Sequence, residues 1–185
     1  SPMVLLRSLG EDQNFQTWLH QYMLPAEKAL LSEAFVEEGT TLAIAEMLLS
    51  GTTTFNEHYF HPHACAAAVK KYGIRACIGL WVGQCNHPGY DNEAHTIQQI
   101  QKLLDTLAPH ERISYALAPH SPYLVSEQAL KTIQRLSMQY HMPVHIHCQE
   151  TQHEINESIK HHGLRPIERL AKLGLVNEHL LAVHM

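Results

Sequence analysis

Short apolar, β-branched runs alternate with helical segments along most of the chain. Strands are predicted at residues 52–56, 74–82, 113–118, 143–148 and 180–184, and at least one helix separates each strand from the next. Strands joined through helices pair in parallel, with right-handed crossovers. The alternation therefore predicts an α/β fold, which is either a doubly wound open sheet or a (β/α)8 barrel.

Capping signals place the helices between these strands. Ser32 is expected to begin a long helix that Gly51 ends, and Ser126 to begin another that runs to about residue 140. Residues 1–32 are expected to be irregular with a helical portion at 14–22, and residues 83–92 to form a loop rich in Gly, Asn and Pro. The apolar face of the long helix is expected to include Phe35, Leu42, Ala43, Ala45 and Leu49.

Histidines stand at the carboxyl ends of three consecutive predicted strands: His120, His147 and His184. No Gly-rich nucleotide-binding motif follows any strand, which removes the usual reason to favour an open sheet. A barrel gathers its catalytic groups on the face formed by the carboxyl ends of its strands. The sequence therefore predicts a (β/α)8 barrel of which this chain supplies about strands two to six, because a whole barrel takes ~250 residues. An excerpt of a longer chain is expected, since residues 180–185 stop within a predicted strand.

His147 and Glu150 lie three residues apart at the end of one predicted strand. An imidazole can hold a divalent ion, and a nearby carboxylate can shuttle protons for water that the ion activates. The alternative is that a strand histidine is only a core or rim residue. The two further strand-end histidines favour metal-assisted hydrolysis.

Composition narrows the classes of binding partner and the cellular compartment that are expected for the protein. The net charge is -5 and only 13 residues are Lys or Arg, none clustered, so nucleic-acid binding is not expected. No apolar run is long enough to span a bilayer, so no membrane partner is expected. The four cysteines form no C-x-x-C pair and are expected to be reduced, which predicts a cytoplasmic protein.

Several motifs, taken in order, resemble the amidohydrolase superfamily, and most closely its 5-methylthioadenosine/S-adenosylhomocysteine deaminases and the related triazine-hydrolase-like proteins. The resemblance covers essentially the whole chain. The motifs that carry it are Leu24-Pro25-Ala26-Glu27, Gly51-Thr52-Thr53-Thr54-Phe55, Ala118-Pro119-His120-Ser121-Pro122-Tyr123, His147-Cys148-Gln149-Glu150-Thr151 and Ala182-Val183-His184-Met185.

The resemblance implies a role for each matching residue. His147 matches a metal ligand, Glu150 the proton shuttle, and His184 the histidine beside the metal-bound water. His120 matches a histidine that hydrogen-bonds the purine, and Glu27 a glutamate that accepts from the ribose hydroxyls. The implied cofactor is one divalent metal ion, with zinc favoured, because zinc lowers the pKa of its bound water to about 7.

The chain also departs from the family pattern. The His-x-His pair of the first strand and the aspartate of the eighth strand have no counterpart in it, so the remaining metal ligands are expected outside this sequence. The strand at 113–118 has no lysine, which favours a mononuclear site. His145 is interpreted as an interior residue, and Leu80 stands where some adenosine-type members carry arginine.

Residues 1–185 are therefore predicted to be part of one amidohydrolase barrel domain. The predicted reaction is metal-dependent hydrolytic deamination of an aminated purine nucleoside such as S-adenosylhomocysteine or 5-methylthioadenosine. A guanine- or triazine-type amidohydrolase, and a catalytically silent fragment of such an enzyme, remain as alternatives. The isolated chain is expected to be inactive, and the partner is a small aminated heterocycle, with a homo-oligomer possible.

Other candidates are weaker. His58, His61 and His63 lie in one loop and could hold a metal adventitiously, but the loop has no carboxylate or cysteine ligand pattern. Glu57 follows a strand end and is a candidate for a supporting role behind the site.

Overall fold

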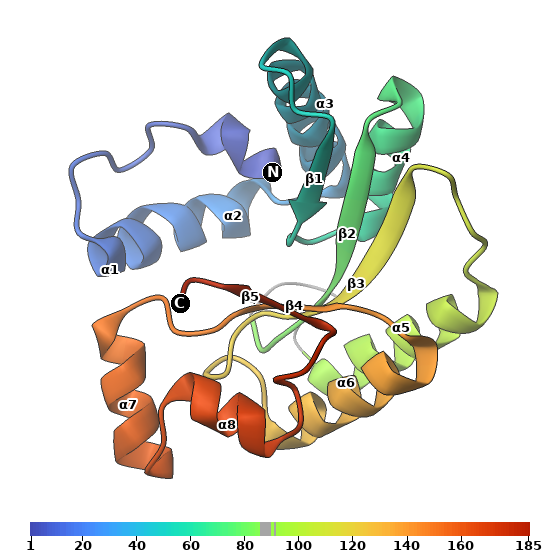
Figure 1. Ribbon diagram of the computed structural model, residues 1–185. Helices are drawn as coiled ribbons and strands as arrows, with labels where there is room; N and C mark the ends of the chain where they lie inside the picture. Colours follow the sequence, from blue (N-terminus) through green and yellow to red (C-terminus); the bar gives the residue numbers. More distant parts are fainter. Residues whose placement is uncertain (86–89, 91) are drawn as a thin grey trace. The chain divides into compact units, whose positions relative to one another are not determined.

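The computed structural model of the protein describes residues 1–85, 90 and 92–185 (Figure 1). The loop predicted at 83–92 thus lies partly outside the described residues. Five strands alternate with helices in the order β1-β2-β3-β4-β5, and the pairs β1–β2, β3–β4 and β4–β5 are parallel. The strands are β1 Thr54–Glu57, β2 Arg75–Val82, β3 Ile113–Pro119, β4 Val144–His147 and β5 Leu180–Val183.

The predicted alternation is confirmed, and every predicted strand has a counterpart in the structure. The helical elements are η1 Pro2–Leu6, α1 Phe15–Thr17, η2 Trp18–Met23, α2 Leu24–Leu30, α3 Glu33–Leu49, α4 Pro62–Tyr72, α5 Glu93–Thr106, α6 Glu127–Tyr140, α7 Gln152–His162 and α8 Pro166–Lys172. The chain divides into two compact units, residues 1–78 with 110–114, and residues 79–109 with 115–185. No helix among the described residues is long and apolar enough to cross a membrane.

The beginning of the first unit is more helical than expected. Asn14 accepts a hydrogen bond from the backbone N–H of Thr17 at 3.0 Å, and helical structure then continues through α1, η2 and α2 to Leu30. The middle of this segment, η2, is a wider π-type turn in which the N–H of Leu24 bonds to the carbonyl of Leu19. Pro25 follows directly and has no N–H to donate, so the helix passes it without losing a regular bond.

Helix α3 packs against η1 and α4 in the first unit. Its buried residues are Val36, Gly39, Thr40, Ala43 and Ile44, which follow helical spacing along one face. The expected apolar face was therefore mostly wrong. Leu42 is 42% exposed and Leu49 is 90% exposed, because both side chains lie on the opposite side of the helix from the buried face.

A close approach explains why glycine stands in the middle of α3. A Cβ at Gly39 would lie 2.6 Å from the carbonyl oxygen of Pro2 in η1. Real Cβ atoms do not come so close to backbone, so only glycine fits without displacing η1.

The second unit has one continuous apolar core between its strands and helices. Leu117, Val144 and Ile146 from β3 and β4 pack with Leu130 and Ile133 from α6. The strand residues form near-continuous apolar runs, as parallel strands covered by helices require. At the start of α6, the backbone N–H of Ser126 donates to Glu93 of α5 at 2.9 Å, and its hydroxyl caps the N–H of Ala129 at 3.2 Å.

Candidate active site

Three histidines gather at the carboxyl ends of β3, β4 and β5 in the second unit. The N–H of His120 donates to Val82 at 2.8 Å, and the N–H of His147 donates to the carbonyl of His120 at 3.1 Å. The ring centroids of His120 and His147 lie 5.1 Å apart, and those of His147 and His184 lie 5.2 Å apart. The parallel strands therefore bring together side chains that are 64 positions apart from first to last.

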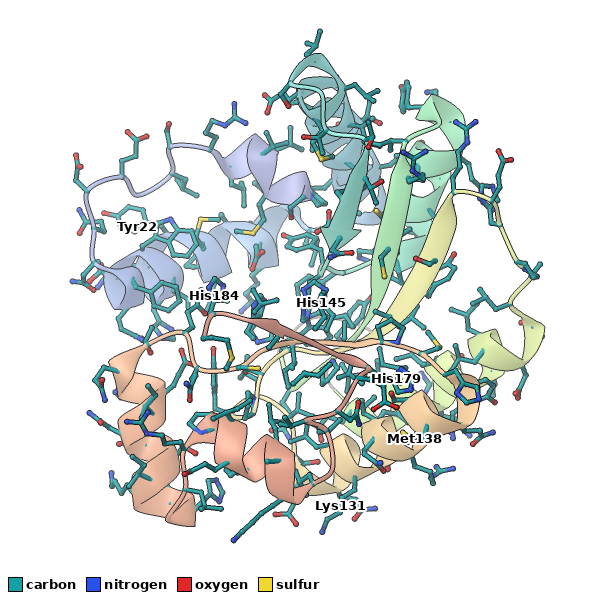
Figure 2. All side chains as sticks on the ribbon, in the orientation of Figure 1. Tyr22, Lys131, Met138, His145, His179 and His184 are labelled. Atoms are coloured by element: carbon teal, nitrogen blue, oxygen red, sulfur yellow. The ribbon has the colours of Figure 1, made fainter. Side chains whose placement is uncertain are left out.

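The pairing of β4 with β5 continues beyond the strands and places Glu150 beside His184. The N–H of Cys148 donates to Val183 at 2.8 Å, and the N–H of Gln149 donates to His184 at 3.0 Å. His184 has a φ of 57°, in the left-handed region, and its Nε2 lies 3.6 Å from Oε1 of Glu150. Figure 2 labels His184 directly after β5 and His145 within β4.

The start of α7 holds the backbone of Glu150. The hydroxyl of Thr151 accepts the N–H of Glu154 at 3.3 Å and donates to Oε1 of Glu154 at 3.0 Å. The other carboxylate oxygen, Oε2, accepts the N–H of Glu150 at 3.1 Å. This reciprocal arrangement resembles a capping box, and it fixes the turn that carries Glu150.

Burial sets the protonation of the site. It lowers the pKa of His120 to about 3, with a smaller contribution from His147. Burial, followed by the neighbouring His184 and His145, lowers the pKa of His147 to about 4. Both imidazoles are thus neutral at pH 7, and a neutral imidazole is the form that binds metal ions. Burial also raises the pKa of Glu150, although His184 opposes the shift.

Aromatic side chains surround His120. The ring centroid of Trp81 lies 6.2 Å from that of His120 and 5.4 Å from that of Tyr90, and the ring of Tyr123 lies 6.3 Å from His120. Nδ1 of His120 lies 3.2 Å from the hydroxyl of Ser121, which also accepts the N–H of Leu124 at 3.3 Å. The flat rings and the imidazole form an environment suited to a planar heterocycle.

Glu27 belongs to α2, in the first unit, and its carboxylate accepts a hydrogen bond from the hydroxyl of Tyr59 at 2.6 Å. Glu57, at the end of β1 in the same unit, is 4% exposed, and burial raises its pKa. The structure therefore gathers His120, His147, His184 and Glu150 in one unit. The relation of Glu27 to them remains a prediction.

Sequence reasoning missed three residues that contact this machinery. Thr151 and Glu154 follow the Thr-x-x-Glu pattern of a capping box, a signal that the sequence does contain. Tyr59 is bonded to Glu27 across 32 positions, and no local pattern indicates it. The interior interpretation of His145 agrees with its 6% exposure.

The donor set suits a divalent metal ion at His147. A half-buried neutral imidazole and a carboxylate with a raised pKa are the groups that such an ion and its chemistry use. Within the described residues, however, the site does not supply three ligand atoms within 4.8 Å of one another, and that spacing is met elsewhere, by Glu33, His61 and His63. His147 would therefore be one ligand among several, as the sequence predicts.

The chain belongs to the amidohydrolase family, whose pattern it matches over residues 3–185. The 5-methylthioadenosine/S-adenosylhomocysteine deaminase of Thermodesulfovibrio yellowstonii is 37% identical over 182 residues, which is 98% of this chain and 42% of that protein. The crystal structure of an adenosine deaminase from Xanthomonas campestris with bound zinc is 41% identical, with a TM-score of 0.95, and the match covers 100% of this chain and 42% of that one.

A guanine deaminase from C. acetobutylicum, solved with bound guanine, shares the fold with a TM-score of 0.79 and 22% identity, over 95% of this chain and 45% of that one. The chain thus spans less than half the length of these relatives. The likenesses confirm the predicted fold class, which is an incomplete (β/α)8 barrel of the metal-dependent hydrolase type.

Proposed function

We propose that the chain is the part of a metal-dependent deaminase barrel that carries the proton shuttle and one metal ligand, and that the whole enzyme acts on an aminated purine nucleoside. One observation carries the proposal: His147, His184 and Glu150 meet at the ends of β4 and β5, with His147 neutral. The named relatives that deaminate nucleosides support the substrate class.

His147 would hold a single zinc-type ion together with ligands beyond this chain. When bound, that ion would supply Lewis-acid activation of water. Zinc in the related adenosine deaminase supports this choice of metal. The absence of lysine from β3 supports a single ion, because β3 then offers no lysine to bridge two ions.

Glu150 would move the protons of the reaction. Burial raises the pKa of its carboxyl, which shifts it in the direction that favours proton donation as well as acceptance. It would take one proton from the attacking water and deliver it to the ring nitrogen as the C–O bond forms. It would then carry the second proton, from the added hydroxyl, to the amine, which leaves as ammonia when the C–N bond breaks. His184, 3.6 Å away, would hold the carboxylate and the water in position.

His120 and Glu27 would recognise the substrate. If the hydroxyl of Ser121 donates to Nδ1 of His120, the proton of the imidazole lies on Nε2, which then donates to a heterocycle nitrogen. Trp81 and Tyr123 would flank the base. The carboxylate of Glu27, oriented by Tyr59, would accept from the two vicinal ribose hydroxyls.

The test uses the full-length protein that carries this sequence, with metal content measured beside deamination of S-adenosylhomocysteine, 5-methylthioadenosine and guanine. About one metal per subunit that is lost in His147→Ala, together with nucleoside activity, is expected. Glu150→Gln should lower kcat by roughly 10²–10⁴-fold with metal retained. Glu157→Gln, an exposed carboxylate on α7, should remain fully active. Absence of bound metal, or a fully active Glu150→Gln protein, would overturn the proposal.

A substitution at Glu27 distinguishes the nucleoside hypothesis from the guanine or triazine alternative. A bare base has no ribose hydroxyls, so Glu27→Gln should impair nucleoside turnover and leave guanine turnover unchanged. If guanine is the better substrate and Glu27→Gln has no effect, the alternative replaces the nucleoside assignment.

We also propose a reducing, cytoplasmic location. Free thiols at Cys65, Cys77 and Cys148 support it, because such residues persist where glutathione keeps thiols reduced.

A further inference from the structure

The first unit brings together two imidazoles and a carboxylate that are separate in the sequence. Glu33 is the first residue of α3, His61 precedes α4, and His63 is its second residue. Nε2 of His63 lies 2.9 Å from Oε1 of Glu33, and the rings of His61 and His63 are 5.9 Å apart and perpendicular. The loop around His61 and His63 lacks a carboxylate of its own, and the packing of α3 on α4 supplies Glu33 from 28 positions earlier.

One ligand atom from each of the three residues lies within 4.8 Å of the others. Around a tetrahedral ion with bonds of about 2.0–2.1 Å, neighbouring ligand atoms are separated by about 3.3 Å. The difference between these two separations is small enough for rotation of the side chains to remove. His63 and Glu33 can do so, since their side chains are 62% and 68% exposed and are not locked by packing.

The backbone at the group is held more firmly than its side chains. His61 has a left-handed conformation, with φ 50° and ψ 59°, and Pro62 fixes the first turn of α4. The carbonyl of His61 accepts the N–H groups of Ala64 and Cys65 at 2.9 and 3.3 Å. The hydroxyl of Ser32 accepts the N–H of Phe35 at 3.1 Å and fixes the start of α3 next to Glu33. Preorganised ligand positions reduce the entropy lost on binding an ion.

We infer that Glu33, His61 and His63 form a second metal site, which takes a zinc-type transition-metal ion and links the start of α3 to the start of α4. Two imidazoles and one carboxylate are a zinc donor set, and they leave one position for water. They do not suit Ca²⁺ or Mg²⁺, which prefer oxygen ligands only. The inference is independent of the proposed deaminase function, because none of these residues belongs to its site.

Two effects oppose each other at this position and set the strength of binding. The amino ends of α3 and α4 carry partial positive charge, which disfavours a cation. The carboxylate of Glu33 offsets this charge, and without it two imidazoles would face the helix ends with no negative charge beside them. Removing Glu33's charge should therefore weaken binding as strongly as removing His63.

The test measures Zn²⁺ stoichiometry on the full-length protein by equilibrium dialysis at micromolar Zn²⁺, with metal counted by mass spectrometry. The wild type should bind one more Zn²⁺ than either His63→Ala or Glu33→Gln. The matched controls are His153→Ala and Glu37→Gln, an exposed histidine and an exposed carboxylate outside the group, and both should bind as the wild type does.

A second measurement guards against loss through misfolding. Co²⁺ added in place of Zn²⁺ should give absorption bands of a site with nitrogen and oxygen ligands, weakened in His63→Ala while its circular dichroism matches the wild type. Wild-type stoichiometry in both group variants would overturn the inference. So would an equal loss in Glu37→Gln or His153→Ala, because binding would then be non-specific surface adsorption.

Discussion

Burial determines the chemistry of individual side chains in this chain more than their identity does. Cys65 is 1% exposed on α4, and burial raises the pKa of its thiol to about 12. Cys148, after β4, is 0% exposed, and burial raises the pKa of its thiol as well. Cys77 and Cys85 are partly exposed. The same residue type is thus inert at two positions and accessible at two others.

Cys65 should resist alkylation in the native protein. At pH 8 a thiol with a pKa of about 12 is ionised to only ~10⁻⁴, and only the thiolate reacts. A raised pKa means that the reactive fraction grows about tenfold for each unit that the pH rises. Iodoacetamide labelling followed by peptide mass spectrometry should show Cys65 unmodified in buffer and fully modified in guanidinium chloride. Fast native labelling at Cys65 would contradict its burial.

The hydroxyl of Tyr59 should matter to substrate binding through Glu27. A hydrogen bond to a charged group contributes about 1.5–3 kcal/mol, so Tyr59→Phe should raise the nucleoside KM by roughly tenfold or more and change kcat less. Tyr72→Phe is the matched control, because that side chain is exposed on α4. An unchanged KM in Tyr59→Phe, with a raised KM in Glu27→Gln, would show that Tyr59 does not position Glu27.

Helix starts position the candidate functional residues of both units. Glu150 precedes α7, Glu33 opens α3, and His61 precedes α4. Side-chain caps define the starts of α3 and α7, through Ser32 and Thr151. Sequence patterns detect such caps, and the cap at Ser32 was predicted, whereas the Thr-x-x-Glu pattern at Thr151 is present in the sequence but was overlooked.

Replacement of Glu154 should slow catalysis indirectly, through the position of Glu150 and not through a contact of Glu154 with the substrate. Its carboxylate holds the N–H of Glu150, and a displacement of about 1 Å at a catalytic group can cost up to ~10²-fold in rate. Glu154→Ala should therefore lower kcat by roughly tenfold or more while metal content stays unchanged. Glu157→Ala, one turn further along α7, should leave kcat as it is. Equal kcat values for the two variants would remove Glu154 from this role.

Gly39→Ala should destabilise the protein, although alanine is the better helix former. Helix propensity alone would favour alanine by about 1 kcal/mol. The clash with the backbone of Pro2 should outweigh this gain, since overpacking costs about 1–3 kcal/mol. Urea unfolding should show a lower midpoint for Gly39→Ala. Ala45→Gly, at an exposed position of the same helix, measures the effect of helix propensity alone on the midpoint. A higher urea midpoint in Gly39→Ala would mean that η1 moves to accommodate the added methyl group at little cost.

For the whole molecule, local patterns were sufficient to predict the order of elements and the class of fold. Strand runs, caps and the strand-end histidines each depend on neighbouring residues, and they led to a barrel with its chemistry at one edge. Contacts between distant segments were not predictable. The wrong face assigned to α3 is the clearest case, since Leu42 and Leu49 are apolar yet exposed, and only the packing of η1 and α4 selects the buried side.

The candidate site likewise combines features that local sequence predicts with contacts between distant segments that it does not. His147 and Glu150 are neighbours in one motif, so their closeness followed from the sequence. The bond from Tyr59 to Glu27 and the approach of Glu33 to His63 join residues that are 32 and 30 positions apart. Nothing in either local segment encodes these contacts, because they arise only when distant segments pack together.

The histidines at the strand ends stand outside the apolar core that Leu117, Val144 and Ile146 build. Mutations in the loops that carry them can therefore accumulate without eroding the interior. A gene duplicate of this family would be free to drift towards a new heterocycle through exposed loop residues such as Tyr123, while selection on the core continues unchanged. Divergence of substrates among relatives that keep one architecture is the evolutionary outcome expected of such a separation.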